Sequence, residues 1–174
     1  MNKSEFNSCA GLVNDETMSK AGIAYSEAIT SGKDPLQVML DMQKGLQVAL
    51  ADKFEWVPHP DKLETCGEIL DWMKLWDDAI DDETRELYVA LGGMSNGKDA
   101  SAITKVWKKN HGEARARKFA DLSDDDKIEI SMELIDQWHF VLIKMLGLGL
   151  TAKDIFKLYY LKNAENFARQ ERGY

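Results

Sequence analysis

Two carboxylates on one helix face are the first candidates for chemistry in this sequence. Glu133 and Asp136 stand three residues apart inside the run 129–143, so in a helix they share one face. Most of the surrounding side chains are apolar, which favours burial of this helix. Because like charges repel strongly away from water, a hard divalent cation such as Mg²⁺ would suit the pair. An exposed acidic edge of an amphipathic helix is the alternative explanation.

A second pair with the same spacing is Glu83 and Glu86. It follows Asp81 and Asp82, which we expect to cap a helix that ends near residue 92. Acidic residues are favoured in a first helical turn whatever the function. By itself, therefore, this pair is weak evidence for a metal site.

The C-terminal segment places a cation, an amide and a guanidinium on successive turns of one helix face, at Lys162, Asn166 and Arg169. Together these groups can hold the oxygens of a polyphosphate. A solvated basic helix end that interacts favourably with the helix dipole is the alternative.

The elements that must position these residues are all predicted to be helices. The three prolines lie between residues 35 and 60, so the second half of the chain has no breaker except glycine. Asp34 and Thr151 are predicted N-caps. We expect an all-α helical bundle of about six to seven helices, in a single domain over residues 1–174 with an inserted polar helical segment at about 95–121. The expected helices span about 15–31, 35–52, 61–77, 81–92, 95–121, 123–147 and 151 to the end.

Composition narrows the function further. The formal net charge of -8 and the sequence pI near 4.9 argue against a protein that coats nucleic acid, and no direct nucleic-acid binding is expected. Cys9 and Cys66 have neither the number nor the spacing of a disulfide framework or zinc site, which favours a reducing cytoplasm. The longest apolar run, 140–150, is too short to cross a bilayer, so no membrane role is expected.

The motifs taken together resemble a known family. Their order is ExxE, then ExxD followed by His-Phe, then the terminal string Tyr-x-Lys-Asn-x-x-Asn-x-x-Arg-Gln-x-x-Gly-Tyr. This order is similar to that of the all-α NTP pyrophosphatases, which include the dimeric dUTPases and the MazG-like enzymes. Within the family, the strings at 34–43, 59–65 and 156–163 resemble the phage enzymes that act on dCTP and dUTP. The likeness runs from about residue 34 to the last residue.

The resemblance implies a role for each candidate residue. Four carboxylates would hold Mg²⁺, those of Glu83, Glu86, Glu133 and Asp136. Three C-terminal side chains would bind phosphates, those of Lys162, Asn166 and Arg169. Gln43 and Gln47 fall where the dimeric dUTPases contact the base, although two polar positions on an outer helix face would look the same. Lys108, in the string Trp107-Lys108-Lys109, is a candidate phosphate contact. The 46 residues between Glu86 and Glu133 exceed the interval in compact MazG-like domains, and Asp82 is the nearest substitute ligand.

The implied activity is Mg²⁺-dependent hydrolysis of dCTP and dUTP to the monophosphate and pyrophosphate, which removes dCTP during phage DNA synthesis. The resemblance also implies a homodimer or higher homo-oligomer in the infected bacterial cytoplasm, with other phage nucleotide-synthesis enzymes as further partners. The alternatives are a dimeric-type dUTPase, a MazG-like housecleaning enzyme for another nucleotide, or a catalytically inactive helical interaction protein.

Overall fold

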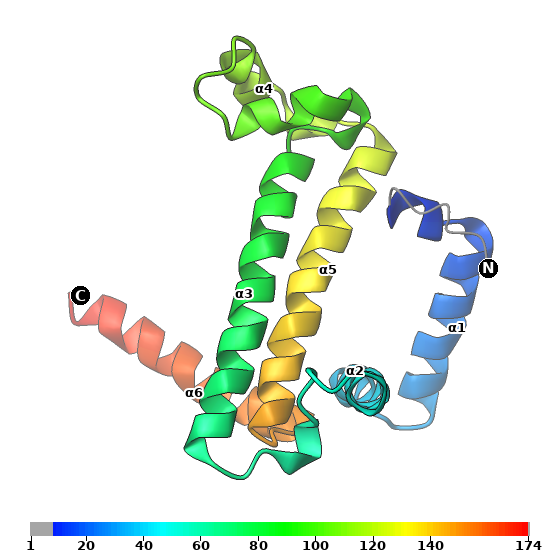
Figure 1. The fold of residues 1–174 in the computed structure, drawn as a ribbon, viewed down its shortest axis with the longest axis vertical. Helices are drawn as coiled ribbons and strands as arrows, with labels where there is room; N and C mark the ends of the chain where they lie inside the picture. Colours follow the sequence, from blue (N-terminus) through cyan, green and yellow to red (C-terminus); the bar gives the residue numbers. More distant parts are fainter. Residues whose placement is uncertain (1–8, 174) are drawn as a thin grey trace. The chain divides into compact units, whose positions relative to one another are not determined.

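The computed structural model describes residues 9–173, which form six α-helices joined by short 3-10 helices and loops (Figure 1). The described residues contain no strand, so the all-α prediction is confirmed. None of the described helices is both long enough and apolar enough to cross a membrane. The elements are η1 (Cys9–Leu12), α1 (Asp15–Thr30), α2 (Pro35–Lys53), η2 (Pro60–Lys62), α3 (Cys66–Ala90), η3 (Met94–Ile103), α4 (His111–Ala116), η4 (Phe119–Asp121), α5 (Asp124–Gly147) and α6 (Ala152–Glu171).

Two predicted helix starts are confirmed at the level of hydrogen bonds. The Asp34 carboxylate accepts a 2.9 Å bond from the backbone N–H of Leu36 and caps α2. Thr151 and Asp154 form a reciprocal capping box at the start of α6, in which each side chain accepts from the backbone N–H of the other. The N-terminal end of α6 is therefore fixed by local chemistry.

The two helices expected at 61–77 and 81–92 are in fact one, because α3 runs without a break from residue 66 to 90. No glycine or proline lies between Asp77 and Ala90. The expected caps lie on the helix surface instead, where Asp82 pairs with Arg85 one turn later at 2.5 Å. Glu83 therefore sits in the middle of a helix, and first-turn acidity does not explain it.

The polar segment 95–121 is not one exposed helix but a series of short pieces, η3, α4 and η4. Gly97 adopts φ 56° and ψ -126°, which breaks the helical path. Polar side chains then bond to backbone groups in place of a helical ladder. The backbone N–H of Ser95 donates to Asp126 at 2.9 Å, and the Arg117 guanidinium donates to the Gly92 carbonyl at 2.8 Å.

The chain forms two compact units, each discontinuous in sequence. The first comprises residues up to 24 and 74–141, and the second comprises residues 25–73 and 142–174. In the first unit, α3 and α5 run side by side in opposite directions (Figure 1), with Ala90, Leu122 and Ile130 buried together near one end. The single domain over residues 1–174 stays a prediction.

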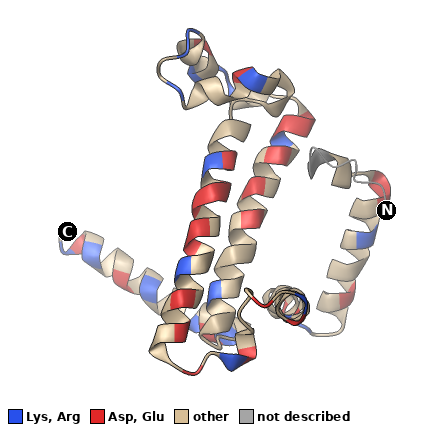
Figure 2. Ribbon diagram, viewed as in Figure 1, with Lys and Arg blue, Asp and Glu red and all other residues tan. Residues whose placement is uncertain are grey.

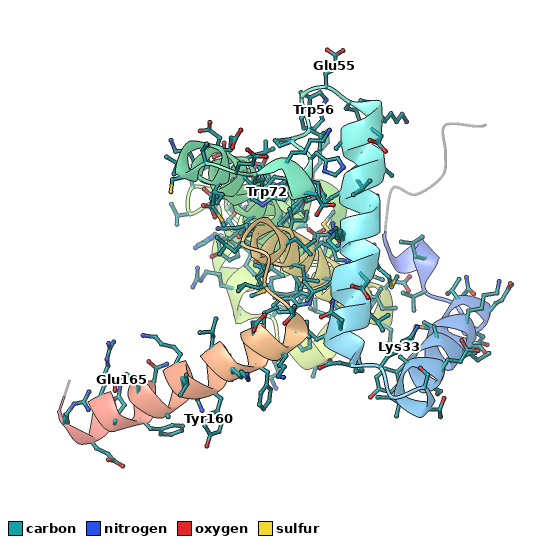
Figure 3. All side chains as sticks on the ribbon, turned by 90° about the horizontal axis from the view of Figure 1, so that it is seen from below. Lys33, Glu55, Trp56, Trp72, Tyr160 and Glu165 are labelled. Carbon is teal, nitrogen blue, oxygen red and sulfur yellow. The ribbon has the colours of Figure 1, made fainter. Side chains whose placement is uncertain are left out.

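The second unit is built around Trp72, which is fully buried and donates a 3.1 Å hydrogen bond from Nε1 to the carbonyl of Ile143 (Figure 3). The Gln37 amide oxygen accepts from the backbone N–H of Ala152 at 3.0 Å and joins α2 to α6. Trp76 is also buried, whereas Trp138 is only half-buried.

Gly147 is expected to be intolerant of a side chain. A Cβ at this position would overlap the Trp72 indole nitrogen, and that ring is fixed by burial. We therefore expect Gly147→Ala to lower the free energy of unfolding by about 1–3 kcal/mol in urea denaturation. At Gly45, inside α2, an added Cβ would meet no atom within 4 Å, so Gly45→Ala should stabilise the protein by up to about 1 kcal/mol. Equal changes in the free energy of unfolding for Gly147→Ala and Gly45→Ala would contradict the close packing of Gly147 against Trp72.

Candidate active site

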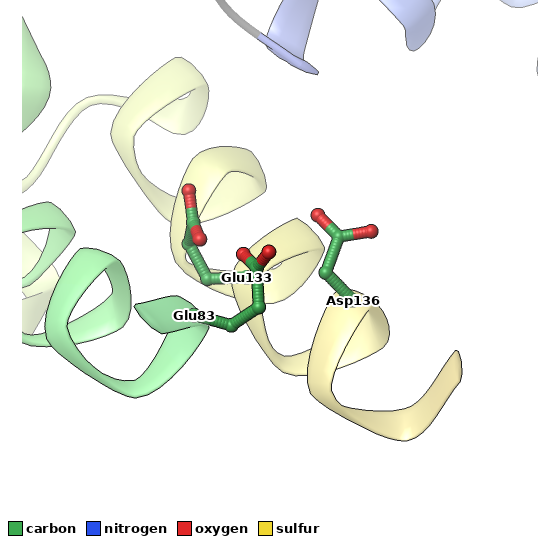
Figure 4. Close-up of side chains that lie close together, drawn as sticks. All are labelled: Glu83, Glu133 and Asp136. Carbon is green, nitrogen blue, oxygen red and sulfur yellow. The ribbon is translucent and has the colours of Figure 1, made fainter. Parts of the chain in front are cut away.

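The carboxylates of Glu83, Glu133 and Asp136 converge in the first unit. One oxygen from each residue lies within 4.8 Å of the others. Figure 4 shows the Glu83 side chain reaching from α3 between the two side chains that α5 contributes. Residues 50 apart in sequence thus form one half-buried cluster, which we call the acidic cluster.

Apolar layers on either side of the acidic cluster set the register of the two helices. Two turns away along α3 and α5, Trp76 and Phe140 stack with ring centroids 5.7 Å apart. In the other direction, Leu87 packs against the buried cluster to which Ile130 of α5 belongs. Because these contacts fix how α3 slides along α5, Glu83 is held at the level of Glu133.

Burial raises the pKa of Glu133 to about 7, and the negative charges of Glu86, Glu83 and Asp136 act in the same direction. The pKa of Glu83 is also raised, first by burial and then by the charges of Asp136 and Glu86, while a hydrogen bond with the Glu133 carboxyl acts in the opposite direction. In the metal-free protein, therefore, the carboxyl of Glu133 takes up a proton at a much higher pH than an exposed glutamate does.

The acidic cluster fits a hard divalent cation. One carboxylate oxygen of Glu133, Oε2, is buried and has no hydrogen-bond partner. Within residues 9–173, no lysine or arginine forms an ion pair with Glu83, Glu133 or Asp136. A small cation with all-oxygen ligands, such as Mg²⁺, would satisfy that oxygen and offset the repulsion.

The structure brings Glu86 near this cluster but not into it. Its charge raises the pKa of both Glu83 and Glu133, yet its side chain is exposed and contributes no atom to the convergent set. The suggested substitute ligand, Asp82, is exposed and paired with Arg85. Of the first acidic pair, Glu83 is thus the residue that meets the second pair.

Gln43 and Gln47 lie on α2 in the second unit, and neither is on an outer face. Their exposed fractions are 6% and 2%, so the alternative of two outward-facing polar positions is wrong. The amide oxygen of Gln47 is buried without a hydrogen-bond partner. An unpaired buried amide oxygen is costly, which makes Gln47 a candidate for contact with a ligand.

Lys162, Asn166 and Arg169 share one face of α6, as their spacing predicts. Lys162 and Asn166 are exposed, whereas Arg169 is half-buried and its Nε donates to Glu165 at 3.0 Å. We call Lys162, Asn166 and Arg169 the α6 stripe. Lys108 lies far from this stripe along the chain, in the loop before α4, where its amine is 3.5 Å from the Lys98 carbonyl oxygen.

Sequence reasoning missed Gln137. Its amide nitrogen is buried without a partner, one turn after Glu133 toward Phe140. The signal was present, because positions 133, 137 and 140 share one helix face and a polar residue between a carboxylate and an aromatic ring is unusual there. Gln137 therefore offers a donor beside the acidic cluster.

The described residues form an all-helical fold with a carboxylate cluster between two antiparallel helices, which is suited to hold a divalent cation. Comparisons with known proteins show to which family of such proteins the chain belongs. A protein named dCTP pyrophosphatase from Enterobacteria phage LZ5 is 60% identical over 171 residues, covering 97% of this chain and 98% of its own length. One of the same name from Enterobacteria phage T4 is 51% identical over 170 residues, covering 97% and 98%. The chain belongs to the family of phage dCTP pyrophosphatases.

A longer relative shares the same sequence region. A protein of phage T4 named DNA replication protein is 51% identical over 159 residues, which cover 91% of this chain and 40% of that protein. No family model matches the chain, and no solved structure matches it.

Proposed function

We propose that this chain hydrolyses dCTP, with dUTP as a second substrate, to the nucleoside monophosphate and pyrophosphate in an Mg²⁺-dependent reaction. The acidic cluster is the observation that supports this activity most directly, because a family of nucleotide pyrophosphatases needs a group that neutralises a triphosphate. In the cytoplasm of an infected bacterium, the reaction would remove dCTP from the nucleotide pool during phage DNA synthesis.

In this proposal the acidic cluster and Glu86 hold the cation. A Mg²⁺ ion held by these residues would offset the charge of the triphosphate and would make a water molecule more acidic for in-line attack on phosphorus. Glu83 faces both α5 carboxylates, and its pKa is raised, so it is suited to orient the attacking water and accept its proton. Lys162, Asn166, Arg169 and Lys108 would bind phosphate oxygens.

The test is a panel of nucleotides assayed for pyrophosphate release with Mg²⁺ and with EDTA. We expect turnover of dCTP and dUTP, no turnover in EDTA, and little turnover of purine nucleotides. Preference for a purine nucleotide would favour the housecleaning alternative. Absence of turnover for every nucleotide would contradict the proposal and favour a non-catalytic interaction protein.

We assign base recognition to Gln47, with Gln43 beside it. Cytosine presents an amino donor where uracil presents a carbonyl acceptor, and an amide can rotate to meet either. The Gln47→Glu variant keeps an acceptor for the amino group of cytosine. With uracil, however, its carboxylate oxygen would face the carbonyl oxygen of the base, and two acceptors repel each other. Since an unpaired buried hydrogen-bonding group costs about 1–3 kcal/mol, kcat/KM for dCTP over dUTP should rise by roughly one to two orders of magnitude.

The matched variant is Gln47→Ala, which removes both amide groups and should lower kcat/KM for the two substrates alike. An equal fall for both substrates in Gln47→Glu would place Gln47 away from the base. Circular dichroism of both variants checks that the buried substitution leaves the helices intact.

We also propose that the protein is a homodimer or higher homo-oligomer. Exposed apolar residues are frequent on α6, and Figure 3 shows Tyr160 projecting from it. Such a surface is typical of protein interfaces. Light scattering should give at least twice the 19.7 kDa chain mass, and Phe156→Asp should reduce it. A monomer at micromolar concentration would contradict the proposal. The exposed apolar residues of α6 are Phe156, Leu158, Tyr159, Tyr160, Leu161 and Phe167, and each is more than half exposed.

A further inference from the structure

The segment between α3 and α5 reverses the charge of the chain. Residues 94–121, which we call the basic insert, contain seven lysines and arginines against three acidic residues. The segment carries a formal charge of +4 in a chain whose total is -8. Figure 2 shows blue positions in this segment, whereas α3 and α5 carry mainly red ones. A local positive surface of this kind attracts polyanions.

Most cations of the basic insert form no contact that holds the fold together. Across residues 9–173, no ion pair involves any of them. Lys108 and Arg117 donate only to backbone carbonyls, at 3.5 Å and 2.8 Å. The remaining side chains form no hydrogen bond with the described residues: Lys98, Lys105, Lys109, Arg115 and Lys118. Their charges are therefore available to a ligand.

Two aromatic rings stand exposed among these cations. Trp107 is 77% exposed and lies in the run Lys105-Val-Trp-Lys-Lys, and Phe119 is 56% exposed and follows Arg117 and Lys118. Aromatic faces interleaved with cations provide the two contacts that unpaired nucleotides need, stacking for bases and charge for phosphates.

Short hydrogen bonds hold the basic insert in place. Asp126 is 3% exposed and accepts from the backbone N–H and the hydroxyl of Ser95, at 2.9 Å and 2.7 Å. His111 Nδ1 lies 2.7 Å from the Ala102 carbonyl oxygen. Because Ser95 is tied to α5 and Arg117 is tied to Gly92, just after the end of α3, the exposed rings belong to an ordered surface, which limits the entropy lost on binding.

We propose that the basic insert binds single-stranded nucleic acid, with Trp107 and Phe119 stacking on bases and the unpaired lysines and arginines neutralising phosphates. This binding goes beyond the hydrolysis proposed above, shares only Lys108 with it, and does not depend on it. The expectation of no nucleic-acid binding rested on the total charge. Screening limits repulsion from acidic surfaces to about 8–10 Å at physiological salt, so the local charge decides binding.

The test is fluorescence anisotropy of a labelled 20-mer of dT, which contains no cytosine, with the full-length protein in EDTA and 50 mM salt. We expect saturable binding that weakens steeply with salt, as expected when several phosphates are neutralised. Trp107→Ala should raise Kd by about tenfold, since stacking of one base is worth that much. Lys109→Glu with Lys118→Glu should raise Kd further and flatten the salt dependence.

Trp56 supplies the matched control, because it is 69% exposed but lies next to Glu55, outside the basic insert (Figure 3). Trp56→Ala should leave Kd unchanged. Absence of saturable binding, or equal effects of the two tryptophan variants, would overturn the proposal. Duplex DNA bound as tightly as the single strand would also overturn it. Tighter binding of poly-glutamate than of the 20-mer would identify an acidic protein as the partner instead.

Discussion

Replacement of Glu133 by Gln is expected to abolish turnover of dCTP. The residue contributes the buried unpaired oxygen of the acidic cluster, and a neutral amide binds a hard cation poorly. Loss of a hydrogen-bond partner of a metal ligand already costs 10–100-fold, so loss of the ligand itself should lower kcat by more than about 100-fold. Asp136→Asn should behave in the same way.

The same variant should change stability with a sign that depends on pH. Because the pKa of Glu133 is raised from 4.5 to about 7 in the folded protein, the stability it contributes is complete below about pH 4.5 and is lost as pH rises through 7. The Glu133→Gln variant has no ionisable group at this position, so its stability does not fall in this way as the pH rises. At pH 8 in EDTA, it should therefore be more stable than the unsubstituted protein, by about 1–2 kcal/mol after allowance for partial solvent exposure.

Addition of Mg²⁺ should reverse this order, because a cation that binds only the folded state stabilises it by about 2.7 kcal/mol at a hundred times Kd. Thermal melts with EDTA and with Mg²⁺ measure the sign of the stability difference between the variant and the unsubstituted protein under each condition. Asp125→Asn is the control, since this residue is exposed in the first turn of the same helix. Near-normal activity of Glu133→Gln at saturating Mg²⁺ would rule out the metal assignment.

Removal of the cations on one face of α6 is expected to have the second largest effect. Lys162→Met and Arg169→Met should each lower kcat/KM by about 10–150-fold, the equivalent of 1.5–3 kcal/mol for a hydrogen bond to a charged group. Glu165 accepts from Arg169 at 3.0 Å and from Arg172 at 2.7 Å, which holds the Arg169 guanidinium on this face. Deletion of everything after Leu161 should remove activity.

The protein should stay folded after these changes, because Lys162 and Asn166 are exposed. Lys157 is the matched control: it lies on the same helix but on the opposite face, so Lys157→Met should retain kcat/KM. A rise in KM for dCTP with helicity unchanged would support phosphate binding by the stripe. Unchanged kcat/KM in both stripe variants would exclude that role.

The sequence by itself determined the features that depend on neighbours within about four residues. The N-caps at Asp34 and Thr151 were predictable because a short polar side chain bonds to a backbone N–H two or three residues later. The shared faces of Glu133 with Asp136 and of Lys162 with Arg169 follow from helical periodicity alone. The family motifs are made of these local strings, so the resemblance was readable as well.

Only the tertiary structure decided the features that depend on contacts between distant residues. Glu83 joins Glu133 because Trp76, stacked on Phe140, fixes the register of α3 against α5, and no local pattern encodes that alignment. The raised pKa of Glu133 follows from the same packing, since charges 50 residues away in sequence contribute to it. Burial of Gln47 likewise depends on what covers α2, whereas helical periodicity reports only which residues share a face.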